Sequence, residues 1–236
     1  MYSNRNYRKQ MRSDDLIHFN VSIGETDLFV SAEKDLSDLI SKTVAKYRKI
    51  LLEYQDKAFF ESFEPVSVSD SAHPMIKYMS RAAEISGTGP MASVAGAIAE
   101  YTARDIAPYS RELIIENGGD IYIRSGKNRR IRIFAGDSVL SNKITLEIES
   151  GQTPIGVCTS SGTVGHSFSY GKADAVVVLS PDIILADALA TAAANIIKKP
   201  EDIEASIQFI KNIEHTTGVL IIIKDKLGIW GDIRLV

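Results

Sequence analysis

The sequence predicts an α+β fold in a single domain, with helices packed against antiparallel or mixed sheets. Segments typical of helices and segments typical of strands alternate irregularly, which does not match the regular strand–helix repeat of an α/β protein. No repeat of about 20–50 residues and no low-complexity linker divides the chain. With 236 residues, of which 44% are apolar, the chain is long enough to bury a substantial core.

The first half of the chain is expected to be mostly helical. Alternating apolar residues over 16–32 predict a hairpin that turns at Gly24. Apolar residues at helical spacing then predict a long helix over residues 34–61. A second helix is expected to begin at Pro74, because proline suits the first position of a helix. The small apolar residues over 91–107 predict a buried helix that another backbone can approach closely.

The second half changes to short β-branched segments bounded by turns, which are typical of strands. These strands are expected over residues 112–117, 120–125, 130–136, 143–149, 174–180 and 218–225, with a closing hairpin over 227–236. An alanine-rich helix is expected over 181–197 and an amphipathic helix over 201–213. The segment 156–171 is rich in Gly, Ser and Thr and poor in charge, so it suits the lining of an anion site better than a core.

Charge and composition exclude several classes of protein. The formal net charge of −3 excludes a bulk polycation that coats nucleic acid. No apolar run approaches the roughly 20 residues of a membrane span, so neither nucleic acid nor membrane is an expected partner. The first 13 residues carry basic side chains and no acid, and are expected to form a flexible leader before a domain over 14–236. The lone cysteine and the lack of a secretory signal predict a cytoplasmic protein.

Cys158 is the first candidate for chemistry. A cysteine is a nucleophile only as a thiolate, so something must lower its pKa. His166 could fold back to it, and the backbone amides and hydroxyls of the following residues could converge on an anion. The residues expected to bind the ligand in this way are Thr159, Ser160, Ser161, Gly162 and Thr163. A small buried thiol that packs as a hydrophobe would explain the same cysteine.

Two glycine-rich turns could admit a ligand to the backbone. Gly118 and Gly119 precede Asp120 between two expected strands, although a tight hairpin needs the same glycines. Gly89 lies in the break before the small-residue helix, where exposed amides can hold phosphate. A plain turn between two helices would give the same pattern. This break has neither the residues of a P-loop nor the spacing of a dinucleotide fingerprint.

Asp187 and Thr191 lie four residues apart, on one face of the alanine-rich helix. A carboxylate and a hydroxyl in this arrangement suit a hard cation such as Mg²⁺, given further oxygens from elsewhere. An aspartate that complements the helix dipole, beside an ordinary threonine, is the alternative.

Four strings in order resemble one family: GTGPMASVAGAIAEY, ENGGDIYI, GVCTSSGTVGHSFSYGKADA and LADALATAAAN. They resemble a short prokaryotic branch of the ApbE-like superfamily, which includes the flavin transferases that move FMN from FAD to a protein threonine. The resemblance covers most of the chain. The string from Cys158 to Ala175 is the most specific and indicates the short branch rather than the transferases.

The resemblance implies roles for particular residues. Gly118, Gly119 and Asp120 match a glycine-bearing hairpin of the transferases, and the Thr159–Gly162 loop is similar to a loop of theirs. Asp187 and Thr191 match the pair that binds Mg²⁺, and FAD or FMN is the implied cofactor. The residues 95–97 look similar to the helix start that lines the flavin site. The transferases' His-Ile-Ile-Asp-Pro-x-Thr-Gly segment is missing from this sequence.

Three functions are therefore expected in order. The first is a persulfide carrier or sulfurtransferase for homocysteine or cysteine synthesis, as proposed for the short branch. In it Cys158 holds the sulfur, His166 moves the proton, and a small anionic acceptor binds in the cleft. The second is a Mg²⁺-dependent flavin-nucleotide enzyme, either an FMN transferase or an FAD pyrophosphatase. The third is a ligand-binding module without activity. The apolar C-terminal strand and the small-residue helix would suit a homodimer.

Overall fold

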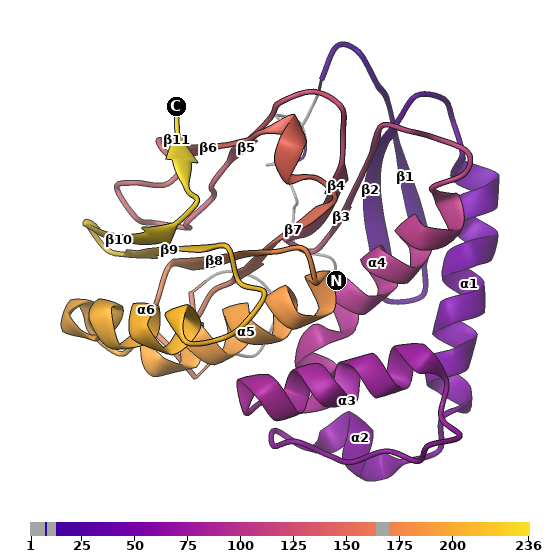
Figure 1. Cartoon of the computed structure of the whole chain (residues 1–236), viewed down its shortest axis with the longest axis horizontal. Coiled ribbons are helices and arrows are strands. Elements are labelled where there is room, and N and C mark those ends of the chain that lie inside the picture. Colours follow the sequence, from indigo (N-terminus) through magenta and orange to yellow (C-terminus); the bar gives the residue numbers. More distant parts are fainter. Residues whose placement is uncertain (1–7, 9–12, 164–169) are drawn as a thin grey trace.

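A computed structural model of the chain describes residues 8, 13–163 and 170–236 (Figure 1). Within these residues, two antiparallel sheets and the helices form layers. The large sheet has eight strands in the order β1-β2-β3-β4-β7-β8-β9-β10, and the small sheet has three in the order β11-β6-β5. Helices cover one face of the large sheet, and the small sheet lies on the other side, near β9 and β10 (Figure 1). The predicted α+β class is confirmed.

The strands of the large sheet are β1 (Ile17–Ile23), β2 (Thr26–Ala32), β3 (Leu113–Asn117), β4 (Asp120–Arg124), β7 (Ile155–Ser160), β8 (Ala175–Ser180), β9 (Gly218–Ile223) and β10 (Lys226–Gly231). Those of the small sheet are β5 (Arg129–Arg132), β6 (Thr145–Ile148) and β11 (Arg234–Leu235). The expected closing hairpin is wrong, because β10 pairs with β9 whereas β11 pairs with β6. Gly231 has a φ of +85°, which turns the chain from one sheet to the other.

The helices are α1 (Ser37–Glu53), α2 (Lys57–Glu61), α3 (Pro74–Ser86), α4 (Val94–Ile106), α5 (Ile183–Ile196) and α6 (Ile203–Lys211). Short 3₁₀ turns are η2 (Pro90–Ser93), η3 (Ser150–Gln152) and η4 (Pro200–Asp202). The expected long helix over 34–61 is divided, because Tyr54 is extended and Asp56 caps a new helix by accepting the Ala58 amide. Pro74 begins α3 as predicted.

The large sheet carries a hydrophobic core on each face. The larger core lies under the helices and the smaller one between the two sheets. Every residue of β8 and β9 is buried, as expected of central strands covered on both faces. Residues 155–160, where a polar loop was expected, form the buried strand β7 instead. Helix α5 lies against β7 and β8, with only its second half reaching the surface.

Arg8 corrects the expected flexible leader. It is only 9% exposed, and its Nε donates to Glu116 Oε2 at 2.5 Å while Nη1 donates to Asp27 Oδ2 at 2.8 Å. Glu116 is fully buried, so its carboxylate needs this countercharge. The leader therefore contributes at least one residue to the folded domain.

No helix among the described residues combines the length and the apolar character that crossing a bilayer would need.

Candidate functional site

Two buried carboxylates meet where β4, β7, α4 and α5 come together. Asp120 is the first residue of β4, and Asp187 lies in the second turn of α5. We call this pair the acidic junction. Asp187 Oδ2 accepts the backbone amide of Gly96 at 2.7 Å, so the start of α4 points at it. A Cβ on Gly96 would lie 2.8 Å from the Ile183 carbonyl oxygen, which shows that only glycine allows the two helices to cross so closely.

The Gly-Gly hairpin aims Asp120 at the junction. Gly118 and Gly119 turn the chain with φ values of +71° and +112°, as a tight hairpin requires. The Gly119 amide donates to Glu116 Oε1 at 2.9 Å, and Asn117 Nδ2 donates to the Ala95 carbonyl at 3.0 Å. These bonds fasten the turn both to the Arg8–Glu116 ion pair and to the start of α4. The predicted turn is thus confirmed, and its glycines serve the hairpin.

The electrostatics of the junction are unfavourable to two negative charges. Burial raises the pKa of Asp120 well above its usual range, and repulsion from Asp187 raises it further. Burial also raises the pKa of Asp187 to about 7, although the Gly96 amide opposes this. Neither carboxylate has an ion-pair partner among the described residues. A proton or an external cation is therefore needed to stabilise the pair.

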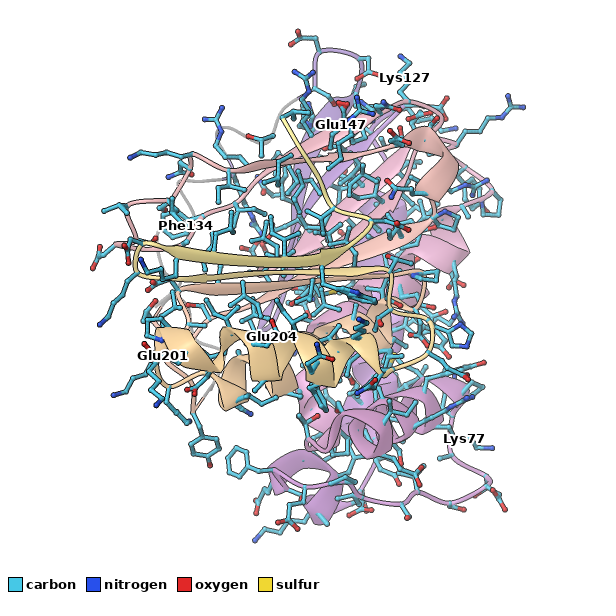
Figure 2. The ribbon with its side chains drawn as sticks, turned by 60° about the vertical axis from the view of Figure 1, so that its left-hand side comes forward. Lys77, Lys127, Phe134, Glu147, Glu201 and Glu204 are labelled. Atoms are coloured by element: carbon cyan, nitrogen blue, oxygen red, sulfur yellow. The ribbon has the colours of Figure 1, made fainter. Side chains whose placement is uncertain are left out.

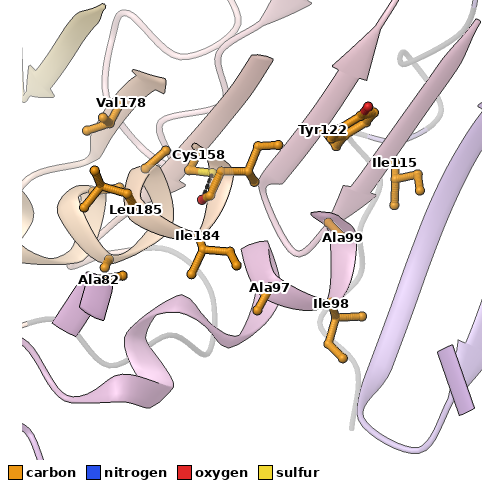
Figure 3. Packing of buried hydrophobic residues seen from close by; sticks show 14 of the residues in the cluster. Ala82, Ala97, Ile98, Ala99, Ile115, Tyr122, Cys158, Val178, Ile184 and Leu185 are labelled. Atoms are coloured by element: carbon orange, nitrogen blue, oxygen red, sulfur yellow. Dashed lines mark hydrogen bonds between the residues drawn. The ribbon is translucent and has the colours of Figure 1, made fainter. Parts of the chain in front are cut away.

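Cys158 is not open to a polar pocket. It lies in β7 with no exposed surface, and its Sγ faces the Ile183 carbonyl oxygen at 3.6 Å (Figure 3). Val178, Ile184 and Leu185 lie around it (Figure 3). Burial raises the pKa of the thiol well above its usual value, and the charges of Asp120 and Asp187 raise it further.

The expected thiolate is therefore wrong for this conformation. The physical reason is that β7 continues through residue 158, so the alternation of the strand turns this side chain toward α5 instead of into a loop. A buried neutral thiol beside two carboxylates is a poor nucleophile. The persulfide hypothesis loses the accessible sulfur on which it depended. His166, its expected proton carrier, lies outside the described residues.

The other residues of the expected anion loop separate into two groups. The Thr159 amide points at Asp120 Oδ1 at 3.2 Å, and the Ser160 hydroxyl is buried without a hydrogen-bond partner among the described residues. Ser161 and Thr163 instead bond locally: the Thr163 amide donates to Ser161 Oγ, and Thr163 Oγ1 to Asp174. Gly162 is fixed by packing, since a Cβ there would lie 2.1 Å from the Gly171 oxygen. The loop therefore does not close on a single anion.

Gly89 is not an exposed phosphate cradle. A Cβ at Gly89 would lie 1.8 Å from the Ser62 carbonyl oxygen, so this glycine allows the chain after α2 to approach. The residue precedes η2, a single short turn. The amides at the start of α4 are directed at Asp187 rather than outward. The expected phosphate site at this break is wrong because the protein's own backbone and carboxylate fill it.

The donors around Asp187 fit a hard cation. Thr191 lies one turn further along α5 and is half-buried, and Ser160 has an orphaned hydroxyl on the neighbouring strand. Carboxylate and hydroxyl oxygens are ligands that Mg²⁺ prefers. No group of three or more His, Cys, Asp or Glu side chains among the described residues is arranged to hold a metal. The remaining ligands would thus be hydroxyls, carbonyls, water or oxygens of a bound substrate.

Some contributors to the site gave no recognisable signal in the sequence. Arg8 lies in a segment that reads as a solvated tail, and only the fold brings it to Glu116, 108 residues away. Asn117 looks like a turn residue, and its bond to Ala95 depends on the placement of α4. Gly96 could be found from its position among small helical residues.

Comparisons with known proteins agree on a family. The model of a family described as "AbpE bacteria" matches residues 8–212. A UPF0280 protein of Methanococcus aeolicus is 36% identical over 228 residues, covering 92% of this chain and 91% of the relative. A UPF0280 protein of Methanopyrus kandleri is 43% identical over 192 residues, covering 80% of this chain and 77% of the relative.

Solved structures show the same fold at much lower identity. The flavinyl transferase ApbE of Pseudomonas stutzeri, in its apo form, has a TM-score of 0.61 at 12% identity, covering 92% of this chain and 94% of that one. The flavin transferase ApbE of Vibrio cholerae has a TM-score of 0.58 at 14% identity, covering 92% and 96%. Identities this low establish a shared architecture, and activity has to be argued from the site.

Proposed function

The chain belongs to the family described as AbpE bacteria, within the ApbE-like superfamily, and from this premise we propose that it is a Mg²⁺-dependent enzyme that cleaves the pyrophosphate of FAD. The observation that carries the proposal is the acidic junction. Two buried carboxylates without a cationic partner lie in a fold shared with proteins named as flavin transferases. A divalent cation and a phosphate-bearing ligand would together supply the missing charges.

Asp187 and Thr191 would hold the Mg²⁺ ion, with Ser160 as a further oxygen donor. When bound, the ion neutralises negative charge on the phosphate oxygens. Asp187 would then ionise, since a nearby cation favours the charged form. Asp120 would keep its proton at the oxygen that does not accept the Thr159 amide, because repulsion from Asp187 and burial both favour the neutral acid.

The reaction balances with water as the co-substrate. The water oxygen forms a bond to the FMN phosphorus, the anhydride bond breaks, and AMP leaves with the bridging oxygen. We propose water as the acceptor because the sequence lacks the His-Ile-Ile-Asp-Pro-x-Thr-Gly segment found in the transferases. A protein hydroxyl in place of water would give a flavinylated protein instead of free FMN.

The test is incubation of the purified chain with FAD and Mg²⁺, with FMN and AMP separated by chromatography. We expect both products with Mg²⁺ and neither with a chelator. Asp187→Asn and Thr191→Val are each expected to slow cleavage by at least about 100-fold, since metal stabilisation of the transition state is worth several kcal/mol.

Glu112→Gln is the matched control, because this carboxylate is also partly buried but bonds to Arg129 far from the site in the sequence. Cleavage by this variant should stay within about twofold of the parent. Covalent FMN on a supplied protein threonine, without free FMN, would indicate the transferase instead. FAD binding without cleavage would indicate a binding module. Absence of both cleavage and Mg²⁺-dependent FAD binding would overturn the proposal.

A further inference from the structure

Strand β10 forms one edge of the large sheet and leaves its outer side unpaired among the described residues. It is joined to β9 by a two-residue turn, with Lys226 opposite Ile223. In such a hairpin the closing pair shares its hydrogen bonds, and the pairs then alternate along the ladder. The backbone groups of Lys226, Gly228 and Trp230 therefore face β9. Those of Leu227, Ile229 and Gly231 face outward.

The outer edge carries apolar side chains where a lone edge strand would carry charges. Leu227 is 39% exposed and Ile229 is 38% exposed, on the face of the sheet toward β11. Figure 2 shows β10 running between the labelled Phe134 above and Glu204 of α6 below. Soluble proteins usually protect such edges with charges, prolines or covering elements. The exposed aliphatic residues instead indicate that a partner strand covers this edge.

The sequence of β10 is complementary to itself in one antiparallel register. We propose that two copies of this chain pair through β10 about a two-fold axis at Ile229, which joins their large sheets into one. Ile229 then faces the partner's Ile229, and the outward amides and carbonyls of the two residues bond to each other. A dimer of this kind is isologous, because the same strand serves both copies.

The neighbouring positions fit this register. Trp230 lies opposite the partner's Gly228, which carries no side chain to block the indole. Lys226 lies opposite the partner's Asp232, so opposite charges meet at both ends of the pairing. A shift by one residue would place Asp225 opposite the partner's Asp232 and would turn the outward backbone groups away from each other. Charge and hydrogen bonding therefore select the same alignment.

The opposite edge of the sheet does not have these properties. Strand β1 places the polar His18, Asn20 and Ser22 at its outward-bonding positions. The Ser13 amide and carbonyl both bond to the His18 ring, so part of this edge is met by the preceding chain. The two edges of one sheet thus differ, and β10 is the one suited to a second copy.

Cysteine cross-linking of the full-length protein tests the register directly. In a hydrogen-bonded antiparallel pair, Cα atoms lie about 5.5 Å apart, so Ile229→Cys should cross-link to its mate with a short bis-maleimide. Leu227→Cys is the matched control, because two Leu227 positions would be separated by four residues along the strand, or about 14 Å. Cys158 is fully buried and leaves the parent protein unreactive.

Oligomeric state provides a second, independent readout by light scattering. Ile229→Pro removes only an outward amide, so β9 pairing survives while the dimer is lost; Ile229→Val keeps the amide and the dimer. Lys226→Asp should raise the dimer dissociation constant about tenfold, and adding Asp232→Lys should restore it. A monomeric parent at the highest soluble concentration would overturn the proposal. So would a dimer that persists in folded Ile229→Pro, or equal cross-linking at position 227.

Discussion

The molecule contains two acidic clusters that differ in their own countercharges. In the first, which we call the Arg129 network, Asp15 and Glu112 both accept from the guanidinium of Arg129, at 2.8 and 2.7 Å. Hydrogen bonds from Arg129 and Lys127 hold the pKa of Asp15 well below its usual range. In the second, the acidic junction, burial raises the pKa of both Asp120 and Asp187.

The difference shows which cluster is complete. Burial alone would raise the pKa of Glu112, but hydrogen bonds from Ser125 and Arg129 outweigh it and leave the pKa below its usual value. The junction has hydrogen bonds from the Thr159 and Gly96 amides but no basic side chain among the described residues. The Arg129 network therefore stabilises the fold as it is, while the junction requires a proton or a cation from outside.

The largest expected effect comes from breaking the complete cluster. Arg129→Met should lower the free energy of unfolding by about 3 kcal/mol, because it leaves two partly buried carboxylates without their cation. Arg130→Met removes the same charge from an exposed side chain and should change stability by less than about 0.5 kcal/mol. Urea denaturation measures both. Equal losses in the two variants would mean that the network is not a stabilising cluster.

Neutralising the incomplete cluster should have the opposite sign. Without Mg²⁺ at pH 8, Asp187→Asn should raise the free energy of unfolding by about 2 kcal/mol, since it removes a buried charge and keeps an acceptor for the Gly96 amide. Glu112→Gln in the Arg129 network should lower it by about 1 kcal/mol. The same denaturation series compares the two. A destabilised Asp187→Asn protein would show that the junction already has its countercharge.

The pH dependence of stability sharpens the same contrast. The pKa of Asp187 is raised from 3.8 to about 7, so the folded state binds its proton more tightly than the unfolded state. The stabilisation from this proton is complete below pH 4 and is lost as the pH rises toward 7, by up to about 1.4 kcal/mol per unit. The pKa of Asp15 is lowered, so its contribution is present at neutral pH and is lost as the pH falls below about 4.

Magnesium should act only where Asp187 is ionised. Added Mg²⁺ should raise the melting temperature at pH 8 and have little effect at pH 5, where protons compete for the carboxylate. Thermal unfolding at the two pH values, with Asp187→Asn as the control, measures this. An equal Mg²⁺ effect at both values, or an unchanged effect in the variant, would contradict a cation at the junction.

The smallest effect is expected at the buried thiol between the clusters' two environments. Cys158→Ala should cost about 1 kcal/mol, from a small cavity and the lost contact with the Ile183 carbonyl. In the native protein the thiol should resist maleimide until the chain unfolds, because it has no exposed surface. Mass spectrometry before and after denaturation gives the answer. Rapid native labelling would restore the possibility of thiol chemistry.

Much of the fold follows from local sequence patterns. The α+β class, the helix beginning at Pro74, the Gly118–Gly119 turn and the alanine-rich α5 all come from periodicity and from residues with restricted or unusual backbone freedom. Asp120, Asp187 and Thr191 were also recognisable, because their strings resemble a known family. The divided helix over 34–61 was not, since the extended Tyr54 interrupts an otherwise helical pattern.

The sequence by itself determined the elements and the residue types available for chemistry, because backbone preference and side-chain periodicity act over a few residues. Only the tertiary structure decided that Arg8 balances Glu116, that Gly89 admits the Ser62 backbone, and that β10 and β11 join different sheets. It also decided the state of Cys158, whose surroundings come from β7, α5 and Asp120 together. Burial and charge at a site depend on which distant segments meet there, and no short stretch of sequence records that meeting.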